Sequence, residues 1–243
     1  MDSSVLIVFE GEVAERKVWD SLSRFYFSDG QIPVVCAVYC GEIYSLFNRL
    51  KADSDLDVFA LLKGNPKNQC LADISRDQIS EIHLFFDYDG HATAASDEAL
   101  AEMLEVFSEE TEEGKLYISY PMVESVRHHH PDVDFSTLNV ACKQNVNYKK
   151  IVHLSSSYAY KNIAGFSMEQ WNHVVNEHCC KLNYLMRDAF EFPHEHFDQI
   201  SILEAQLTSH INPSSEVAVL SAFPVFLKDY YGCDGLKKLI SSD

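Results

Sequence analysis

The chain has few of the features that mark membrane or secreted proteins. No stretch of its 243 residues approaches the roughly 18 consecutive apolar residues of a membrane-spanning helix. The amino-terminal Met-Asp-Ser-Ser lacks the basic region and cleavage site of a signal peptide. Its seven cysteines are scattered and offer no paired C-x-x-C spacing for zinc or for a disulfide framework. We therefore expect a cytoplasmic protein with reduced thiols and no membrane contact.

Basic residues are also scarce. The chain has 19 lysines and arginines against 37 acidic residues, a net charge of −18. Affinity for phosphate comes largely from Lys and Arg, so this balance argues against a protein that binds nucleic acid by charge alone. An acidic enzyme acting on nucleic acid would need a local basic patch, a bridging metal or a basic partner.

The clearest chemical signal is an apolar run, residues 84–86, that leads into Asp87-Tyr88-Asp89-Gly90. A buried strand reads as such a run, and ligands of open α/β sheets bind outside the carboxyl ends of the strands. Two carboxylates at this spacing repel each other unless a cation lies between them, and Mg²⁺ or Mn²⁺ suits oxygen ligands. The pattern predicts a metal site, with an ordinary polar turn at Asp89-Gly90 as the alternative.

A second apolar run, residues 5–9, ends in Glu10-Gly11-Glu12. Glycine allows a tight turn from a strand into a helix. Glu12 fits the first turn of that helix through the helix dipole, whereas Glu10 lies where the strand ends. Two strands thus deliver carboxylates to what we expect to be one edge of one sheet.

Apolar periodicity predicts alternating strands and helices in residues 1–125, and hence a mostly parallel sheet with helices on both faces. A short apolar run at 57–62 favours a further strand. Residues 126–243 read as a mainly helical domain. The expected strands are 5–9, 32–39, 82–86 and 115–120, and the expected helices are 13–27, 42–50, 95–107, 167–187, 195–210 and 216–230, the last interrupted by Pro224.

The two acidic motifs at strand ends, together with the helices expected between them, resemble a known family. A first strand ending in Glu10-Gly11 and a later strand ending in Asp87-x-Asp89 are similar to the TOPRIM domain of topoisomerases, primases and OLD-type nucleases. Residues 5–124 look most like small bacterial anti-phage TOPRIM nucleases that work beside an ATPase. The resemblance implies a TOPRIM-like α/β fold in which Asp87 and Asp89 hold Mg²⁺ or Mn²⁺. Glu10 would complete the coordination or act as general acid or base.

The resemblance implies further site residues. Pro121-x-x-Glu124 is similar to an element that follows the last strand in some of these nucleases and makes Glu124 a candidate metal ligand. OLD-type enzymes also place a lysine near the metals. Lys149 is the candidate for this catalytic role, although Lys143 and Lys150 belong to the same basic patch and a solvated charged face is the alternative.

Histidines give weaker signals. His91 follows the Asp-x-Asp-Gly motif by one residue and would either contact phosphate or lie exposed. His128, His129 and His130 precede Pro131 and suggest a metal-binding tract. Three consecutive side chains cannot all point one way, so we expect a surface loop there.

These features together predict a metal-dependent nuclease that cleaves DNA or RNA, with transfer RNA among the candidate substrates. By resemblance it would be the toxic effector of an anti-phage system, controlled by an ATPase partner, and a homodimer is compatible with this setting. The helical half, with Trp171, Tyr184 and Phe190, is where we expect the surface for a partner or substrate.

Two other functions remain open. In a haloacid-dehalogenase-type phosphatase, Asp87 would be the nucleophile and Asp89 the general acid, but that family gives Glu10 no role. The other alternative is a non-catalytic acidic adaptor or inhibitor on a TOPRIM-like scaffold. The net charge favours this reading, and the carboxylates at strand ends disfavour it.

Overall fold

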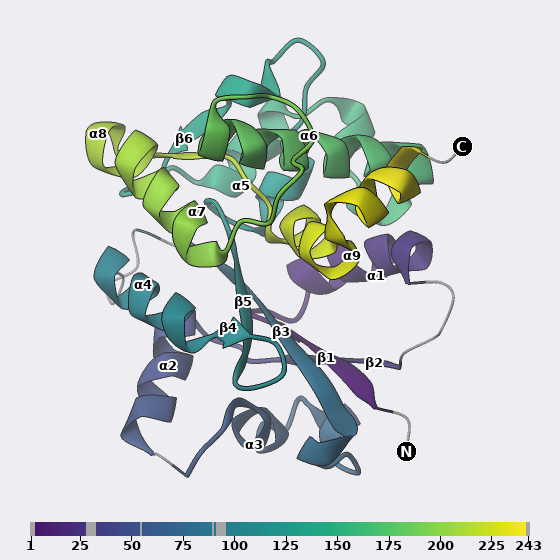
Figure 1. The fold of residues 1–243 in the computed structure, drawn as a ribbon, viewed down its shortest axis with the longest axis vertical. Coiled ribbons are helices and arrows are strands. Elements are labelled where there is room, and N and C mark those ends of the chain that lie inside the picture. Colours follow the sequence, from purple (N-terminus) through teal and green to yellow (C-terminus); the bar gives the residue numbers. More distant parts are fainter. Residues whose placement is uncertain (1–2, 28–32, 54, 89, 91–95, 242–243) are drawn as a thin grey trace. The chain divides into compact units, whose positions relative to one another are not determined.

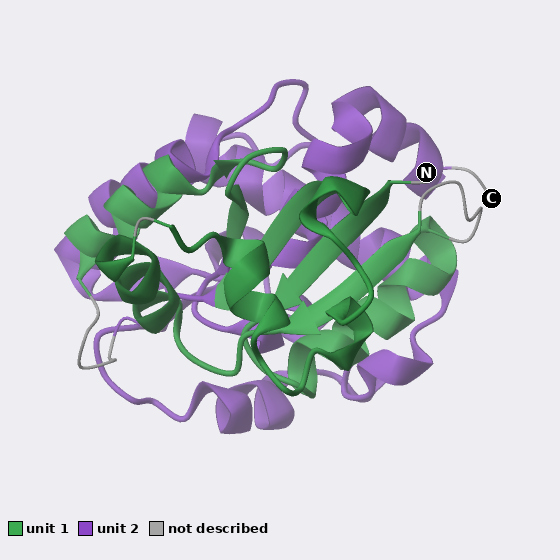
Figure 2. Ribbon diagram, turned by 90° about the horizontal axis from the view of Figure 1, so that it is seen from below, with its two compact units in different colours: residues 1–86, 94–117 green, residues 87–93, 118–243 purple. Residues whose placement is uncertain are grey.

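The computed structural model describes residues 3–27, 33–53, 55–88, 90 and 96–241. The chain forms two compact units, which Figure 2 shows in different colours. Unit 1 comprises residues 1–86 and 94–117, and unit 2 comprises residues 87–93 and 118–243. The predicted domain boundary between residues 125 and 126 stays a prediction.

A five-stranded sheet with the order β2-β1-β3-β5-β4 organises unit 1, and the final residues of β3 and β5 belong to unit 2. Strand β1 pairs in parallel with β2 and β3, and β4 pairs antiparallel with β5. This confirms the predicted α/β architecture with a mostly parallel sheet. The elements are β1 (Ser4–Phe9), α1 (Ala14–Tyr26), β2 (Val34–Val38), α2 (Ile43–Ala52), α3 (Val58–Lys63), β3 (Ile79–Asp87), α4 (Asp97–Val106), β4 (Ser108–Glu109) and β5 (Gly114–Ser119).

Helices cover both faces of this sheet. Helix α1 lies on one side, and α2, α3 and α4 lie on the other, where α2 contacts α4 (Figure 1). Residues 5–9 of β1 are consequently buried on both faces, which explains why the strand reads as an unbroken apolar run.

The outer edge of β2 is covered by side chains. The backbone N–H of Val38 donates to Asn68 Oδ1 at 2.8 Å, and Asn68 Nδ2 donates to the Val38 carbonyl at 2.9 Å. The thiol of Cys70 donates to the carbonyl of Cys36 at 3.2 Å. These side chains take the hydrogen bonds that a further strand would make.

The expectation of a strand at 57–62 is wrong, because this run forms helix α3. Asp57 caps the helix, and its side chain accepts a hydrogen bond from the Ala60 N–H at 2.6 Å. A short apolar run does not by itself distinguish a strand from a buried helix. Here the capping carboxylate decides in favour of the helix.

Unit 2 is mainly helical, and its helix α6 packs against α7 and α9. A capping box of Ser167 and Gln170 begins α6, which confirms the helix predicted at 167–187, and Trp171 in its first turn is fully buried. Trp171 therefore cannot contribute to a partner surface, unlike the exposed Phe190. The elements are β6 (Asn139–Ala141), α5 (Tyr148–Ser155), α6 (Met168–Arg187), α7 (Gln199–Gln206), a π-helical turn (Leu207–Ile211), α8 (Asn212–Ser214), β7 (Glu216–Ala218) and α9 (Ala222–Ser241), with short 3₁₀ helices at Val123–Arg127 and Phe135–Thr137.

The last predicted helix, 216–230, is wrong at its start. Residues 216–218 form β7, which pairs antiparallel with β6, and helix α9 begins only at Ala222. Pro224 therefore lies in the first helical turn, where its missing N–H leaves no hydrogen bond unmade. No helix in the described ranges is long and apolar enough to cross a membrane.

Candidate active site

Asp87 is the last residue of β3 and is only 7% exposed. Its Oδ1 accepts a hydrogen bond from the backbone N–H of Val123 at 2.8 Å. Val123 begins the 3₁₀ helix Val123–Arg127, and the N–H of Tyr88 donates to the Ser119 carbonyl at 3.0 Å. The carboxylate is thus fixed between a strand end and the segment that follows β5.

Glu124 lies in the same 3₁₀ helix and is 8% exposed. Its Oε1 is 3.8 Å from Nζ of Lys149, whose side chain is exposed. Its Oε2 is buried and has no hydrogen-bond partner among the described residues. A buried carboxylate oxygen without a partner is costly, so a group that satisfies it would be stabilising here.

Tyr148 is a buried residue that senses the charges of both carboxylates, and the sequence did not single it out. Burial raises the pKa of its hydroxyl well above the ordinary value, and the negative charges of Glu124 and Asp87 raise it further, against the opposing effect of Arg127. Both carboxylates therefore act on one hydroxyl. That hydroxyl is 3.0 Å from Nδ1 of His128, which fixes its orientation.

His128 and His129 are buried, so the expected surface loop at residues 128–130 is wrong for these two residues. Nε2 of His128 is 2.8 Å from the Ser155 hydroxyl, at the end of helix α5. The tract is therefore built into unit 2, and His128 supports the tyrosine of the candidate site. Sequence spacing gave no sign of this contact, because Tyr148 and Ser155 lie 20 and 27 residues away.

Two lysines of the predicted basic patch lie at this part of unit 2. Lys149 follows Tyr148 at the start of α5 and approaches Glu124. Lys143 Nζ lies 5.6 Å from the centre of the Tyr88 ring, a cation–π distance. Both side chains are exposed, as is that of Lys150, for which the structure gives no contact with the carboxylates.

Gly90 is the one described residue of the turn that follows Tyr88. A Cβ atom at this position would lie 2.4 Å from Tyr88 Cε1 and 3.2 Å from the Cys142 carbonyl oxygen. The site therefore requires glycine here for reasons of space. Asp89 and His91, which the sequence singled out, lie outside the described residues.

Glu10 belongs to unit 1 and directly follows β1. Its N–H donates to the Phe85 carbonyl at 3.1 Å, and its carbonyl accepts from the Cys40 N–H at 2.8 Å. Phe85 precedes Asp87 by two residues in the sequence. The Glu10 side chain is half-exposed at the carboxyl end of its strand, as the sequence predicted.

A second carboxylate near this turn was missed. Glu15 is buried, and its Oε2 would lie 3.4 Å from a Cβ placed on Gly11. An acidic residue in the first turn of a helix was the available signal, but it indicates a dipole contact more often than a ligand. Glu12, in contrast, is exposed and forms an ion pair with Lys67.

The residues present in unit 2 fit a divalent cation of the Mg²⁺ type. Asp87 and Glu124 offer hard oxygen ligands, and the unpartnered Oε2 of Glu124 is the atom that a cation would satisfy. Within the described ranges no three His, Cys, Asp or Glu side chains are grouped as metal ligands. The predicted third carboxylate of this motif, Asp89, is not among those ranges.

Comparison with known proteins gives no match. No protein-family model fits the sequence, and neither the curated proteins nor the solved structures include a match.

Proposed function

We propose that this protein is a Mg²⁺- or Mn²⁺-dependent nuclease that hydrolyses phosphodiester bonds in DNA or RNA. The observation that carries the proposal is a pair of buried carboxylates. Asp87 Oδ1 accepts the N–H of Val123, and Glu124, the next residue, lies beside the exposed Lys149. A buried carboxylate oxygen without a partner, Oε2 of Glu124, is unfavourable, which supports a metal site. Asp89 and Glu10 are the further ligands that the sequence motif supplies.

A bound Mg²⁺ or Mn²⁺ would neutralise the charge of the phosphate and stabilise the attacking and leaving oxygens of an in-line displacement. Asp87 and Glu124 would hold it, with Glu10 as a further ligand or as general acid or base. Lys149 reaches Glu124 from the solvent side and would contact a phosphate oxygen. Tyr148 stays protonated because its pKa is raised, so it positions its neighbours and is not a nucleophile.

The setting that we propose is phage defence, in which an ATPase partner restrains the nuclease until it is triggered. The acidic composition supports the need for a partner or metal, since a net charge of −18 repels nucleic acid. Lys143 and Lys149 are the local cations that a substrate backbone would meet.

Metal binding is the first test, because a missing partner could hide nuclease activity. Mn²⁺ binding is measured by calorimetry for the wild type and for Asp87→Asn, Glu124→Gln and Glu10→Gln. Glu204→Gln, which changes an exposed carboxylate of α7, is the matched control. We expect each site variant to weaken binding by about tenfold or more and the control to bind as the wild type does. Circular dichroism checks that every variant folds.

The pattern of losses distinguishes the candidate functions. Weakening by all three variants supports a shared site and leads to cleavage assays on DNA, RNA and transfer RNA. If Glu10→Gln alone binds normally, the metal lies within unit 2, and the phosphatase alternative is tested with a phosphomonoester. A wild type that binds no Mn²⁺ at millimolar concentration would overturn the nuclease proposal.

The second candidate function is a non-catalytic acidic adaptor that binds a basic partner. The excess of 37 acidic over 19 basic residues is the observation that favours it. This candidate predicts salt-sensitive binding to a basic protein that persists in the Asp87→Asn variant and in EDTA.

A further inference from the structure

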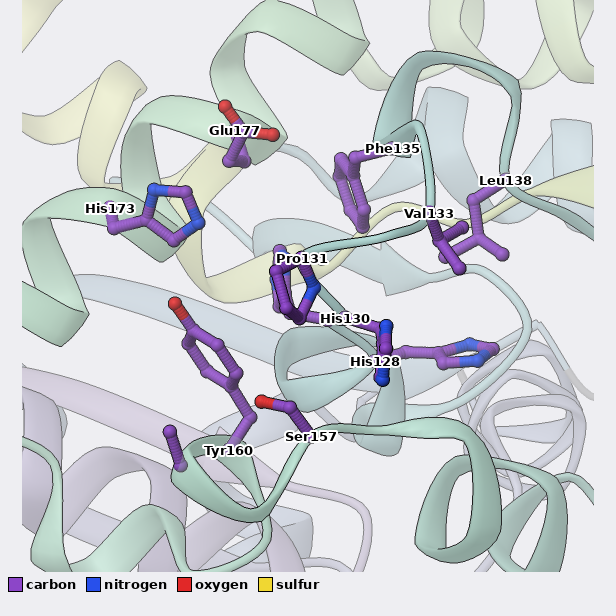
Figure 3. Close-up of a pocket in the computed structure, with 12 residues that line it drawn as sticks. His128, His130, Pro131, Val133, Phe135, Leu138, Ser157, Tyr160, His173 and Glu177 are labelled. Carbon is purple, nitrogen blue, oxygen red and sulfur yellow. The ribbon is translucent and has the colours of Figure 1, made fainter.

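Unit 2 contains a cavity of about 370 Å³ that shares His128 with the candidate active site but none of its carboxylates. It lies between the segment around His129, the segment around Tyr160 and helix α6 (Figure 3). Its volume falls within the range of pockets that bind small molecules. The wall is partly apolar, with Val133, Phe135 and Leu138 on one side.

The charges of this cavity do not favour an anionic ligand. No lysine or arginine is among the described residues that line it. Burial lowers the pKa of His128 to about 4 and that of His129 well below its usual range, so both imidazoles are neutral at pH 7. A phosphate or a carboxylate would find no fixed positive charge in them.

One carboxylate, Glu177, lines the cavity from helix α6. Burial raises its pKa, whereas the attraction of His173, one turn earlier in the helix, and a hydrogen bond from the Asn176 side chain lower it. An ionised carboxylate offers two oxygens that accept hydrogen bonds side by side. Because His173 already lies beside the Glu177 charge, the ligand need not be a cation. A neutral ligand with two adjacent N–H donors can satisfy the carboxylate oxygens equally well.

Aromatic rings surround the same space. The ring centroids of Tyr160 and His129 are 5.2 Å apart, and each lies 6.0 Å from that of His173. The Tyr160 hydroxyl points toward His173 in Figure 3, and this tyrosine is half-exposed, so part of its ring remains available for stacking. Flat rings and a paired acceptor together select a flat heteroaromatic ligand.

His129 supplies an independent sign that a polar ligand belongs here. It is only 4% exposed, and its Nε2 has no hydrogen-bond partner among the described residues. A buried ring nitrogen without a partner is unfavourable. A hydrogen-bonding edge placed in the cavity, directly or through a water molecule, would relieve this cost.

We propose that this cavity binds a guanine base, whose N1–H and exocyclic amine donate to the two carboxylate oxygens of Glu177 while its ring stacks on Tyr160. Among the common bases, guanine alone presents two neighbouring N–H donors of this kind on its Watson–Crick edge. As a role in substrate selection, the inference rests on the proposed nuclease function. It would direct the enzyme to unpaired guanines, because single-stranded bases are those that proteins stack and read by their edges.

The test uses the full chain in EDTA and measures the binding of guanosine, inosine, adenosine and cytidine by calorimetry. Inosine lacks the exocyclic amine of guanosine and is otherwise the same. We expect guanosine to bind about tenfold or more tightly than inosine, because an unmet acceptor on Glu177 is penalised, and adenosine and cytidine to bind more weakly still.

Matched variants locate the effect. Glu177→Gln should lower guanosine affinity by about tenfold or more, whereas Glu169→Gln, an exposed position of α6 outside the cavity, should not. Tyr160→Ala should weaken all nucleosides, and Tyr158→Ala, which removes a ring that is 92% exposed and outside the cavity, is its control.

Equal binding of the four nucleosides, or unchanged binding by Glu177→Gln, would overturn the proposal. The proposal would also be overturned if choline displaced guanosine from the wild type and the protein showed no preference among the bases. That result would assign the ring cluster to a cation. Because EDTA is present throughout, this test does not depend on the metal site. If the protein binds guanosine but no Mn²⁺, the guanine-binding proposal stands and the nuclease proposal is rejected.

Discussion

The two units bury different kinds of residue. Among its described residues, unit 1 buries a core of strand and helix side chains that is almost entirely apolar, with Glu15, Ser21, Asn68 and His83 as the polar exceptions. Unit 2 buries imidazoles, carboxylates and lysines, among them Asp87, Glu124, His128, His129, His178, Lys181 and Lys228. An apolar core supplies stability, whereas buried polar groups add little net stability and fix specific geometry. Both proposed sites draw mainly on unit 2 for this reason.

The largest effect that would sharpen this comparison is the loss of an apolar side chain from unit 1. Phe85 is buried in β3, with its ring 5.6 Å from that of Tyr117 and 6.1 Å from that of Phe9. We expect Phe85→Ala to lower the free energy of unfolding by about 3–5 kcal/mol, measured by urea denaturation. Phe190→Ala, at a position 38% exposed, should cost far less. Equal losses would contradict the burial of Phe85 in the core of unit 1.

Acid should lower the stability of the protein by protonating imidazoles that unit 2 buries in the neutral form. Burial and, to a smaller extent, the charge of Lys181 lower the pKa of His178 to about 3. The unfolded chain binds a proton near pH 6.5 that the folded chain does not bind until about pH 3. Stability is therefore lost as the pH falls from about 6.5, by about 3 kcal/mol from His178 at pH 4.

Denaturation curves at pH 7 and pH 4 check this prediction for His178. The comparison is with His178→Asn, which keeps a polar side chain in helix α6 but does not titrate. The difference in stability between the two pH values should shrink in the variant. The same difference in both proteins would show that the imidazole is protonated when folded.

A smaller effect on stability is expected at Gln206, whose buried side chain forms hydrogen bonds with the backbone of Ala218. Its Nε2 donates to the Ala218 carbonyl and its Oε1 accepts from the Ala218 N–H, each at 2.9 Å. Gln206→Ala leaves both backbone groups of β7 without these partners, which should cost about 2–3 kcal/mol in thermal or urea unfolding. Gln69→Ala, at an exposed position, is the control and should change stability little.

The smallest effect on stability is expected at Lys181, where the cost of burying the charge is offset by the hydrogen bonds that the charge makes. Lys181 Nζ donates to the carbonyls of Ser136 at 2.5 Å and Leu138 at 3.2 Å, and burial lowers its pKa to about 8, against the opposing charge of Asp134. Lys181→Met removes the cost of burying the charge along with the hydrogen bonds. We expect a change within about 1 kcal/mol at pH 7.

The pH dependence is the more telling readout for Lys181. Its folded pKa lies below its unfolded value of about 10.5, so the unfolded chain binds more protons between pH 8 and 10.5. The wild type should therefore gain stability relative to Lys181→Met as the pH rises through this window. A constant difference between the two proteins would mean that Lys181 titrates normally.

The same contrast explains what the sequence could predict. Strands β1 and β3 read as apolar runs because both faces are covered, and α6 was recognisable from its capping box at Ser167. Helix α3 was not, because a six-residue apolar run has too few residues to show a period. Strand β7 was missed since its pairing with β6 joins residues 216–218 to 139–141, far apart in the chain.

The candidate site divides in the same way. Asp87, Glu124 and Glu10 could be singled out because they follow apolar strands. Tyr148 and His128 could not, because their role depends on a contact between a helix start and a 3₁₀ helix end that no spacing rule encodes. The cavity proposed to bind guanine likewise joins residues 129, 160 and 177, which only the fold brings together.

The covered edge of β2 has a consequence for how the protein behaves at high concentration. A short, uncharged strand at the rim of a sheet is a template on which another chain can add a strand and start aggregation. The amide of Asn68 and the thiol of Cys70 occupy the positions that such a chain would use. The colloidal stability of the protein thus depends on two side chains that belong to neither proposed site, and oxidation of Cys70 would expose part of that rim.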